Sequence, residues 1–134
     1  MLSGKYELVT DKMVLFWKPP SVFGQWTRSE FEVDGVKYVT AEQFMMAEKA
    51  RLFGDEDVRN QILDTTDPKL QKALGRQVRN FDESRWREVR VEIVVKGNVA
   101  KFSQNPKMKL ELLATGDRCL VEASPLGKLS VIFS

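Results

Sequence analysis

Hydrophobic residues recur at helical spacing through most of the chain, and five short apolar runs have the pattern of strands. Helices are predicted over residues 41–53, 55–63, 68–77, 83–103 and 106–115. Strands are predicted over residues 14–17, 31–33, 36–39, 119–122 and 129–133. No internal repeat, linker or low-complexity segment interrupts this order, so we expect a single domain over residues 1–134.

Turn and cap residues mark the boundaries of these elements. Asp34-Gly35 between two apolar runs is a strong hairpin signal. Thr40 is the expected N-cap of the first helix, with Gln43 as its capping-box partner, and Gly54 should end that helix. Asp82 should cap the long fourth helix. The sequence therefore predicts a mainly α, α+β domain of about five helices, with a small N-terminal hairpin and short C-terminal strands. It does not predict a doubly wound sheet.

One face of the predicted fourth helix is apolar at the spacing of a buried stripe. Its residues are Trp86, Val89, Ile93, Gly97 and Ala100. Glycine costs about 1 kcal/mol relative to alanine inside a helix. We therefore expect Gly97 to permit the close approach of another backbone.

The predicted first helix carries two charges within its apolar sector. Glu42 and Lys49 are separated by about two helical turns and so share a face, with apolar residues on either side. Burying a charge costs several kcal/mol unless it is paired and hydrogen-bonded. The pair is either a structural ion pair at the edge of the core or part of a functional site. Glu48, on another face, is expected to be solvated.

Composition narrows the available chemistry. The chain has 134 residues, a net charge of +2, no histidine and one cysteine, Cys119. These counts exclude Ser-His-Asp and Cys-His catalysis, histidine metal sites and a disulfide within the chain. Any reaction must then be carried by carboxylates, lysine, hydroxyls or backbone groups. Cys119 lies in an apolar run and is expected to be a small buried side chain.

Two tryptophans are candidates for ligand contact. Trp86 belongs to the apolar stripe and is either a core residue or a platform for a planar ring. Trp26 follows Gln25 in a glycine-containing loop, which either covers a ligand or plugs the core.

Several cations could meet phosphates. Arg76 and Arg79 are expected to close the third helix, where cations also interact favourably with the helix dipole. Lys49 and Arg51 are the other candidates, on the first helix. The helix dipole alone accounts for the two arginines of the third helix.

Several motifs together resemble the YbiA-like family, also called NADAR domains. The longest covers residues 40–55, TAEQFMMAEKARLFGD. The others are residues 73–78 (ALGRQV), 81–82 (FD) with Trp86, 100–106 (AKFSQNP), 112–116 (LLATG) and 120–125 (LVEASP). They occur in the family's order, and the resemblance extends from about residue 14 to residue 125.

The resemblance implies an N-glycosidase. Some family members are implicated in clearing phosphorylated pyrimidine ribosides of early riboflavin synthesis, and others remove ADP-ribose from guanine in nucleic acid. The family's signature glutamate, lysine and tryptophan fall on Glu42, Lys49 and Trp86, which become the catalytic candidates. The ligand-binding candidates, from the Asn/Gln-aromatic motif and the other shared motifs, are Gln25, Trp26, Arg76, Glu122 and Ser124.

The implied mechanism is hydrolysis through an oxocarbenium-like transition state, in which positive charge builds on the sugar. Glu42 would stabilise that charge or activate water. Lys49 would orient Glu42, hold it ionised, or meet a phosphate or ribose hydroxyl. Trp86 would stack on the base or form part of the pocket wall.

The end of the chain departs from the family's pattern. Gly127 stands where the family has a functional aspartate, and Ser130 stands where it has a tryptophan. Glycine cannot replace a carboxylate, so reduced activity is expected, although the apolar tail can still complete a strand. A frameshifted or truncated gene and a degenerate copy are both compatible with this ending. The alternative function is a catalytically impaired module that binds a nucleotide or ADP-ribose.

Partners and location follow from the same features. The modest, dispersed charge favours a small nucleotide-like ligand over a long nucleic-acid duplex. We expect no metal and no cofactor. Since neither a signal peptide nor a membrane-length apolar run is present, we expect a cytoplasmic protein that does not bind membranes.

Overall fold

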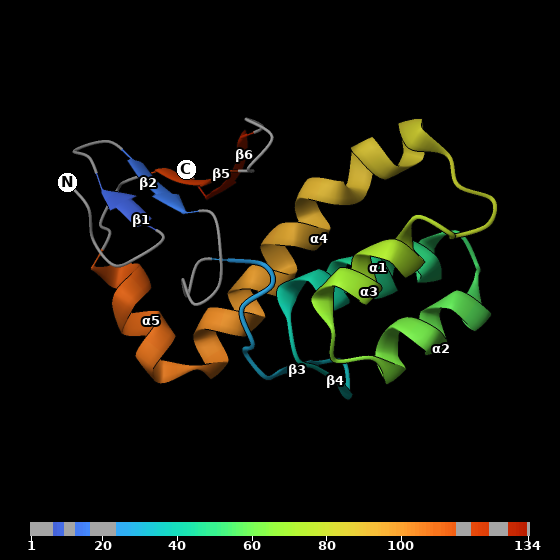
Figure 1. Ribbon diagram of the computed structural model, residues 1–134, viewed down its shortest axis with the longest axis horizontal. Coiled ribbons are helices and arrows are strands. Elements are labelled where there is room, and N and C mark those ends of the chain that lie inside the picture. Colours follow the sequence, from blue (N-terminus) through green and yellow to red (C-terminus); the bar gives the residue numbers. More distant parts are fainter. Residues whose placement is uncertain (1–6, 10–12, 17–23, 115–118, 124–128, 134) are drawn as a thin grey trace.

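Five helices form most of the part of the chain that the structure describes (Figure 1). The computed structural model describes residues 7–9, 13–16, 24–114, 119–123 and 129–133, with side chains for residues 24–114. The helices are α1 (Ala41–Leu52), α2 (Glu56–Asp64), α3 (Pro68–Gly75), α4 (Glu83–Gln104) and α5 (Pro106–Leu113). The predicted helices are confirmed, with ends that differ by one or two residues. No helix among the described residues is long and apolar enough to cross a membrane.

The predicted hairpin is present. Strands β3 (Phe31–Val33) and β4 (Val36–Tyr38) pair antiparallel, with Phe31 opposite Tyr38. Asp34 and Gly35 between them have φ angles of 52° and 81°, as a two-residue type I′ turn requires. The hairpin leads directly into α1 and so fixes where that helix begins.

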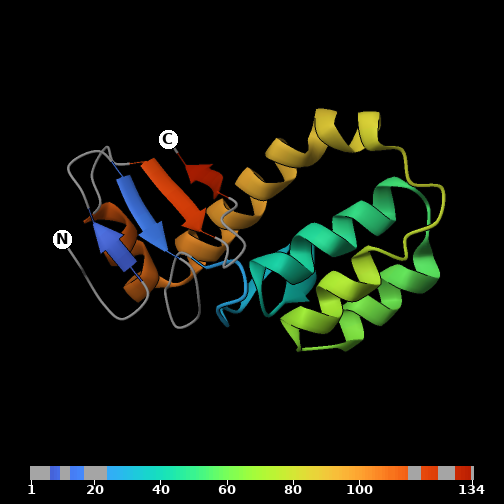
Figure 2. The ribbon, with the colours of Figure 1, turned by 45° about the horizontal axis from the view of Figure 1, so that its top comes forward.

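A second sheet joins the two ends of the chain. It contains β1 (Glu7–Val9), β2 (Met13–Phe16), β5 (Cys119–Ala123) and β6 (Leu129–Phe133), in the order β1-β2-β5-β6. β2 and β5 pair in parallel, while β1 and β6 add antiparallel strands at the edges. Figure 2 shows this sheet beside α4 and α5, away from the group formed by α1, α2 and α3. The sequence analysis predicted three of these strands, but neither β1 nor the pairing.

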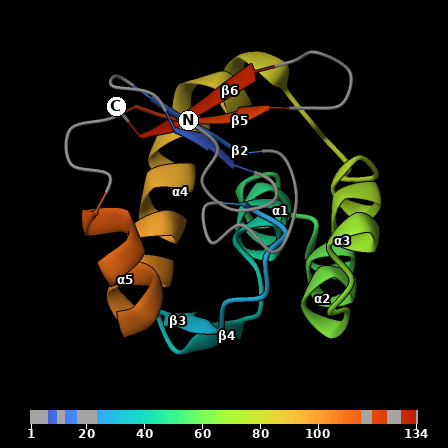
Figure 3. The ribbon, with the colours of Figure 1, turned by 60° about the vertical axis from the view of Figure 1, so that its left-hand side comes forward.

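Helix α1 is the centre of the helical part. It lies between α4 on one side and the pair α2 and α3 on the other (Figure 3). Its Phe44 ring is 1% exposed and lies 5.0 Å from the Tyr38 ring and 6.1 Å from the Phe31 ring, measured between centroids. The core cluster around it consists of Phe31, Tyr38, Phe44, Met46, Ala47, Ala50, Val58, Ile62, Leu74, Val78 and Trp86.

Two glycines allow α3 and α4 to pack closely on α1. A Cβ at Gly97 of α4 would lie 2.6 Å from Cδ2 of Phe44, and one at Gly75 of α3 would collide with Sδ of Met46. The close approach predicted at Gly97 is therefore real, but its partner is the Phe44 ring and not a backbone. The predicted apolar stripe of α4 is confirmed, since Trp86 and Gly97 are buried and its other members are partly buried.

The start of α1 is fixed by Thr40 and Gln43. The Thr40 hydroxyl accepts a hydrogen bond from the Gln43 N–H at 3.0 Å, as predicted for the N-cap. The Gln43 side chain differs from a capping box, because its oxygen accepts from the Val39 N–H at 2.8 Å. Its amide nitrogen donates to the carbonyls of Ile62 and Thr65. Gln43 therefore also binds the end of α2 to α1.

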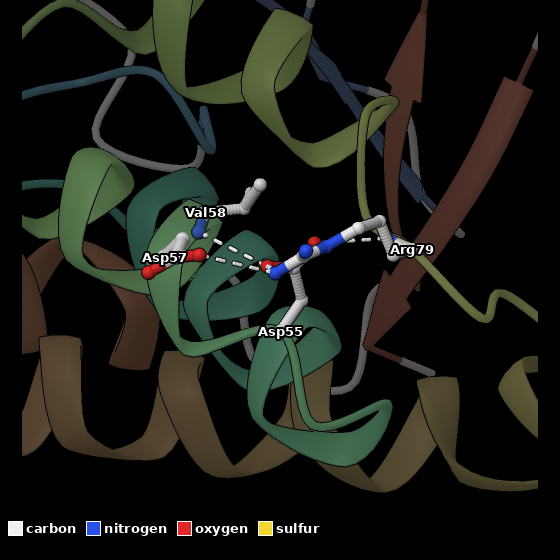
Figure 4. A network of polar contacts seen from close by, with 4 residues as sticks. All are labelled: Asp55, Asp57, Val58 and Arg79. Carbon is white, nitrogen blue, oxygen red and sulfur yellow. Dashed lines mark hydrogen bonds and ion pairs between the residues drawn. The ribbon is translucent and has the colours of Figure 1, made fainter.

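Asp55 is a buried carboxylate that connects α2 to the segment between α3 and α4 (Figure 4). Its Oδ1 accepts from the Val58 N–H at 3.3 Å and from the Arg79 guanidinium at 2.8 Å. Its Oδ2 accepts from the Arg79 backbone N–H at 2.9 Å. The expectation that Arg79 closes the third helix was wrong. α3 ends at Gly75, and Arg79 pairs with the N-terminal end of α2.

This network predicts an acid dependence of stability. The hydrogen bonds from the Arg79 side chain and backbone lower the pKa of Asp55 from 3.8 to about 2. A carboxyl whose pKa is lower in the folded state stabilises the fold above its unfolded pKa, and this contribution is lost as the pH falls toward the folded pKa. Asp55→Asn should therefore destabilise the protein at pH 7. The difference in urea unfolding free energy should shrink between about pH 4 and pH 2. A difference independent of pH would contradict this account.

Candidate functional site

Glu42 lies in the first turn of α1 and is buried, with 5% of the residue exposed. Its backbone N–H donates to the Gln25 carbonyl at 3.0 Å, which holds the residue 25–26 segment against the start of the helix. The N-terminus of a helix interacts favourably with a carboxylate. The structure therefore places a buried carboxylate at the positive end of the α1 dipole.

Lys49 lies two turns further along α1 and is half-buried. Its ammonium is 4.5 Å from the centroid of the Phe81 ring and 5.7 Å from that of Trp86, within the range of cation–π contacts. Burial lowers the pKa of Lys49, while the charge of Glu42 raises it and that of Arg76 lowers it further. The two side chains therefore interact electrostatically, as expected for residues on one helix face.

Trp86 is both a core residue and a neighbour of Lys49. It lies in the first turn of α4, is 8% exposed and belongs to the core cluster. α4 begins at Asp82, whose carboxylate accepts from the Ser84 and Arg85 N–H groups at 2.9 and 3.3 Å, as the sequence predicted. The interpretation of Trp86 as a core residue is confirmed, while its role as a platform for a planar ligand stays a prediction.

The Gln25 side chain is held by α4. It exchanges two amide hydrogen bonds with Asn98, at 3.0 and 3.2 Å, and Asn98 also donates to the Val94 carbonyl at 2.8 Å. The Lys101 ammonium donates to the Gly24 carbonyl at 2.9 Å. Asn98 and Lys101 are 1% and 0% exposed.

Sequence reasoning missed these two residues of α4. A signal was available, since Asn98 and Lys101 lie three residues apart, adjoining the predicted apolar stripe at Gly97 and Ala100. Buried polar groups at such positions need partners. In this fold, their partners belong to the segment that carries the Gln25-Trp26 motif.

Trp26 lies toward α3. The residue is half-buried, and the Lys72 ammonium is 6.0 Å from the centroid of its ring. Arg76, one turn after Lys72, is exposed at the end of α3 and acts electrostatically on Lys49. Lys72 is a further residue that sequence reasoning missed. Its only signal was its position one turn before Arg76 on an exposed helix face.

Other candidates lie elsewhere or outside the described side chains. Arg51 pairs with Glu48 at 2.6 Å; only 14% of the Glu48 side chain is exposed, so the expectation of a solvated Glu48 was wrong. Glu122 lies on β5, where its backbone is between Phe16 of β2 and Ser130 of β6.

Ser124 and Gly127 lie outside the described residues, and so do the side chains of Cys119 and Glu122. The roles assigned to Glu122 and Ser124 therefore stay predictions. Within the described part of the chain, no group of three or more Asp, Glu, Cys or His side chains could hold a metal ion.

The fold agrees with the comparisons with known proteins, whereas the roles of Glu42, Lys49 and Trp86 stay predictions. The model of the NADAR domain matches residues 15–129, and the chain belongs to this family. The match extends a few residues beyond the range predicted from the motifs. The α+β fold is confirmed by the structural neighbour described next.

Three relatives show how widely the similarity extends. "N-glycosidase R617" of Acanthamoeba polyphaga mimivirus is 41% identical over 131 residues, covering 90% of this chain and 77% of that protein. The NMR structure of the Escherichia coli protein YbiA has a TM-score of 0.72 and 27% identity, covering 87% of this chain and 69% of that one. "Riboflavin biosynthesis protein VVA0006" of Vibrio vulnificus is 26% identical over 87% of this chain, but over only 32% of its own length.

Proposed function

We propose that this protein is an N-glycosidase that hydrolyses the bond between ribose and a base nitrogen in a phosphorylated riboside. The observation that carries the proposal is the buried Glu42 carboxylate, electrostatically coupled to the half-buried Lys49 beside Trp86. The names of the mimivirus relative and of YbiA, both N-glycosidases, support the reaction class. The name of the Vibrio relative supports a riboside of the riboflavin-pathway type.

The reaction needs a carboxylate at the sugar. Water adds to C1′ while the C1′–N bond breaks; the base leaves with the bonding electrons and takes up a proton. Positive charge builds on the ribose in the transition state, and a carboxylate can stabilise it or accept the proton of the attacking water. Glu42 has this role. The Lys49 charge favours the ionised form of Glu42 and offers N–H donors to a ribose hydroxyl.

The cations of α3 suit the phosphate of such a substrate. Lys72 lies near the Trp26 ring, and Arg76 acts on Lys49 from the end of the same helix. Neither residue forms an ion pair with another described residue. Arginine and lysine are the usual partners of phosphate oxygens.

The test measures, by liquid chromatography, release of free base from pyrimidine N-ribosides with and without a 5′-phosphate, and release of guanosine from ADP-ribosylated guanosine. Turnover that is fastest with a phosphorylated riboside supports the proposal. Saturable binding without turnover would instead identify the alternative, a nucleotide-binding module that has lost catalysis. Neither turnover nor binding with any of these compounds would overturn both functions.

The proposed contact between the substrate phosphate and the cations of α3 makes a separate prediction. Replacing both Lys72 and Arg76 by alanine should raise the KM for the phosphorylated riboside about tenfold, which corresponds to about 1.4 kcal/mol. The KM for the same riboside without phosphate should not change. Lys109→Ala, on the exposed surface of α5, is the matched control. An equal rise of KM with both substrates would contradict a phosphate contact.

A further inference from the structure

The connection between α3 and α4 carries a ring that faces Lys49. Phe81 is 45% exposed, although its ring lies near Lys49 of α1 and near Phe53, the residue that follows this helix. Its centroid lies 4.5 Å from the Lys49 ammonium and 5.4 Å from the centroid of Phe53, which it meets edge-on at 72°. Hydrophobic burial contributes little at such an exposed position. The placement of this ring must therefore depend on the path of the connection.

That path is fixed at Arg79, two residues before Phe81. One buried carboxylate, Asp55, accepts hydrogen bonds from both the backbone N–H and the side chain of Arg79. The guanidinium also lies 3.2 Å from Asp57 (Figure 4). Two bonds from one residue to one carboxylate fix both its position and its orientation, which a surface ion pair cannot do.

Asn80 then turns the chain back toward α1. Its φ angle of 61° lies in the left-handed region, which asparagine tolerates better than most residues. This reversal directs Phe81 onto α1, and Asp82 immediately begins α4, where Trp86 follows one turn later. The position of Arg79 therefore sets the position of the Phe81 ring and of the start of α4.

We propose that Asp55 and Arg79 are positioning residues for Lys49: their contact holds Phe81 over the ammonium and keeps water from it. The proposal rests on the proposed function only for its kinetic consequence. Among the described residues, neither Asp55 nor Arg79 forms a hydrogen bond or ion pair with Glu42 or Lys49. Both act through the connection.

Burial is the largest cause of the lowered pKa of Lys49. The charged groups that face the ammonium are Glu42 from α1, which raises the pKa, and Arg76 from the end of α3, which lowers it. The rings of Phe81 and Trp86 form its other neighbours. The contact between Asp55 and Arg79 is called the clamp below. Without the clamp, Phe81 can move away and water can reach the Lys49 ammonium. The pKa of Lys49 should then rise toward its ordinary value.

The test compares two exposed arginines with similar ion pairs. Arg79 pairs with Asp55 at 2.8 Å and its side chain is 64% exposed; Arg87 pairs with Glu83 at 2.9 Å and is 70% exposed. The pKa of Lys49 is measured by NMR of 13C-methylated lysines, with the signal assigned through Lys49→Arg. Arg79→Ala should raise this pKa by about half a unit or more, on the scale of shifts that burial produces. Arg87→Ala should not change it.

Two further variants separate positioning from a general loss of stability. Phe81→Ala should raise the Lys49 pKa with the clamp intact, and adding Arg79→Ala to it should cause no further rise. Arg79→Lys, which lacks the planar fork, should give an intermediate value and remains available if Arg79→Ala does not fold. In base release, the alkaline limb of the pH profile should move upward in the same order of variants.

An unchanged Lys49 pKa in folded Arg79→Ala or Phe81→Ala protein would overturn the proposal. The titration needs no turnover, so it separates this proposal from the proposed function. A Lys49 shift in a protein that releases no base would support the clamp and refute the N-glycosidase. Base release with no shift of the Lys49 pKa would support the N-glycosidase and refute the clamp.

Discussion

Glu42→Gln should lower the rate of base release about 10²–10⁴-fold, the range that a positioned acid–base group contributes. Glutamine keeps the shape of the side chain but can neither accept a proton nor balance the positive charge on the ribose. The hydrogen bond from the backbone N–H of residue 42 to the Gln25 carbonyl does not involve the Glu42 side chain. The segment of residues 25–26 should therefore stay in place. The loss should therefore appear in kcat, with a much smaller change in KM.

Glu48→Gln is the matched control. Glu48 is on the same helix, its side chain is also largely buried, and it pairs with Arg51 away from the candidate site. Its replacement removes a charge and an ion pair of α1 but should leave base release within about twofold, since no reacting group is lost. Full turnover in Glu42→Gln would refute the role of Glu42.

The same variant also tests the structural alternative for the pair. The charge of Glu42 raises the pKa of Lys49, so Glu42→Gln should lower that pKa further. If the electrostatic interaction between the two residues serves only the structure, Glu42→Gln should reduce stability without a specific effect on turnover. Measuring unfolding, kcat and the Lys49 titration on one variant distinguishes these cases.

Local signals predicted most of the fold. The positive φ angles at Asp34 and Gly35 follow from the turn type that this dipeptide favours, and the Thr40 cap follows from its hydroxyl. Periodicity gave the buried stripe of α4, since a 3.6-residue period needs only neighbouring residues to be visible. Each of these features is decided within a few residues of sequence.

Pairing between distant segments could not be predicted in the same way. β2 and β5 come from opposite ends of the chain, and no turn between them fixes a register. The capping-box expectation failed because the Gln43 side-chain oxygen accepts from the Val39 N–H, while its amide nitrogen donates to carbonyls at the end of α2, about 20 positions away. Arg79 was misplaced because its partner, Asp55, lies 24 positions earlier, beyond any helical spacing.

In the candidate site too, features within one helix could be predicted from the sequence, and contacts between distant segments could not. The shared face of Glu42 and Lys49 was visible in the sequence because one helix carries both residues. The contacts of Asn98 and Lys101 with the residue 24–25 segment span 73 and 77 positions, so only the fold reveals them. The helical spacing already made Trp86 a candidate for ligand contact, and the family resemblance made it a catalytic candidate. The structure added that its ring lies near the Lys49 ammonium.

Phe44→Ala should destabilise the protein by about 3–5 kcal/mol, the usual cost of emptying a buried aromatic site. Phe44 is almost fully buried between the Tyr38 and Phe31 rings of the hairpin and Gly97 of α4. Its loss should loosen the contacts of α1 with both elements. A domain of this size has about 5–15 kcal/mol of stability, so urea unfolding should still give a measurable transition. Phe81→Ala, at an exposed ring, should cost only about 1 kcal/mol.

The effect of Gly97→Ala on the free energy of unfolding should have opposite signs in the wild type and in the Phe44→Ala variant. In the wild type the new Cβ would lie 2.6 Å from the Phe44 ring, and overpacking costs about 1–3 kcal/mol. The higher helix propensity of alanine offsets about 1 kcal/mol of that cost. In Phe44→Ala the ring is absent, only the propensity gain remains, and Gly97→Ala should stabilise the protein. The difference between the two backgrounds, measured as a double-mutant cycle, gives the ring–glycine contact. An equal effect in both backgrounds would show that α4 does not depend on Gly97 to pack against Phe44.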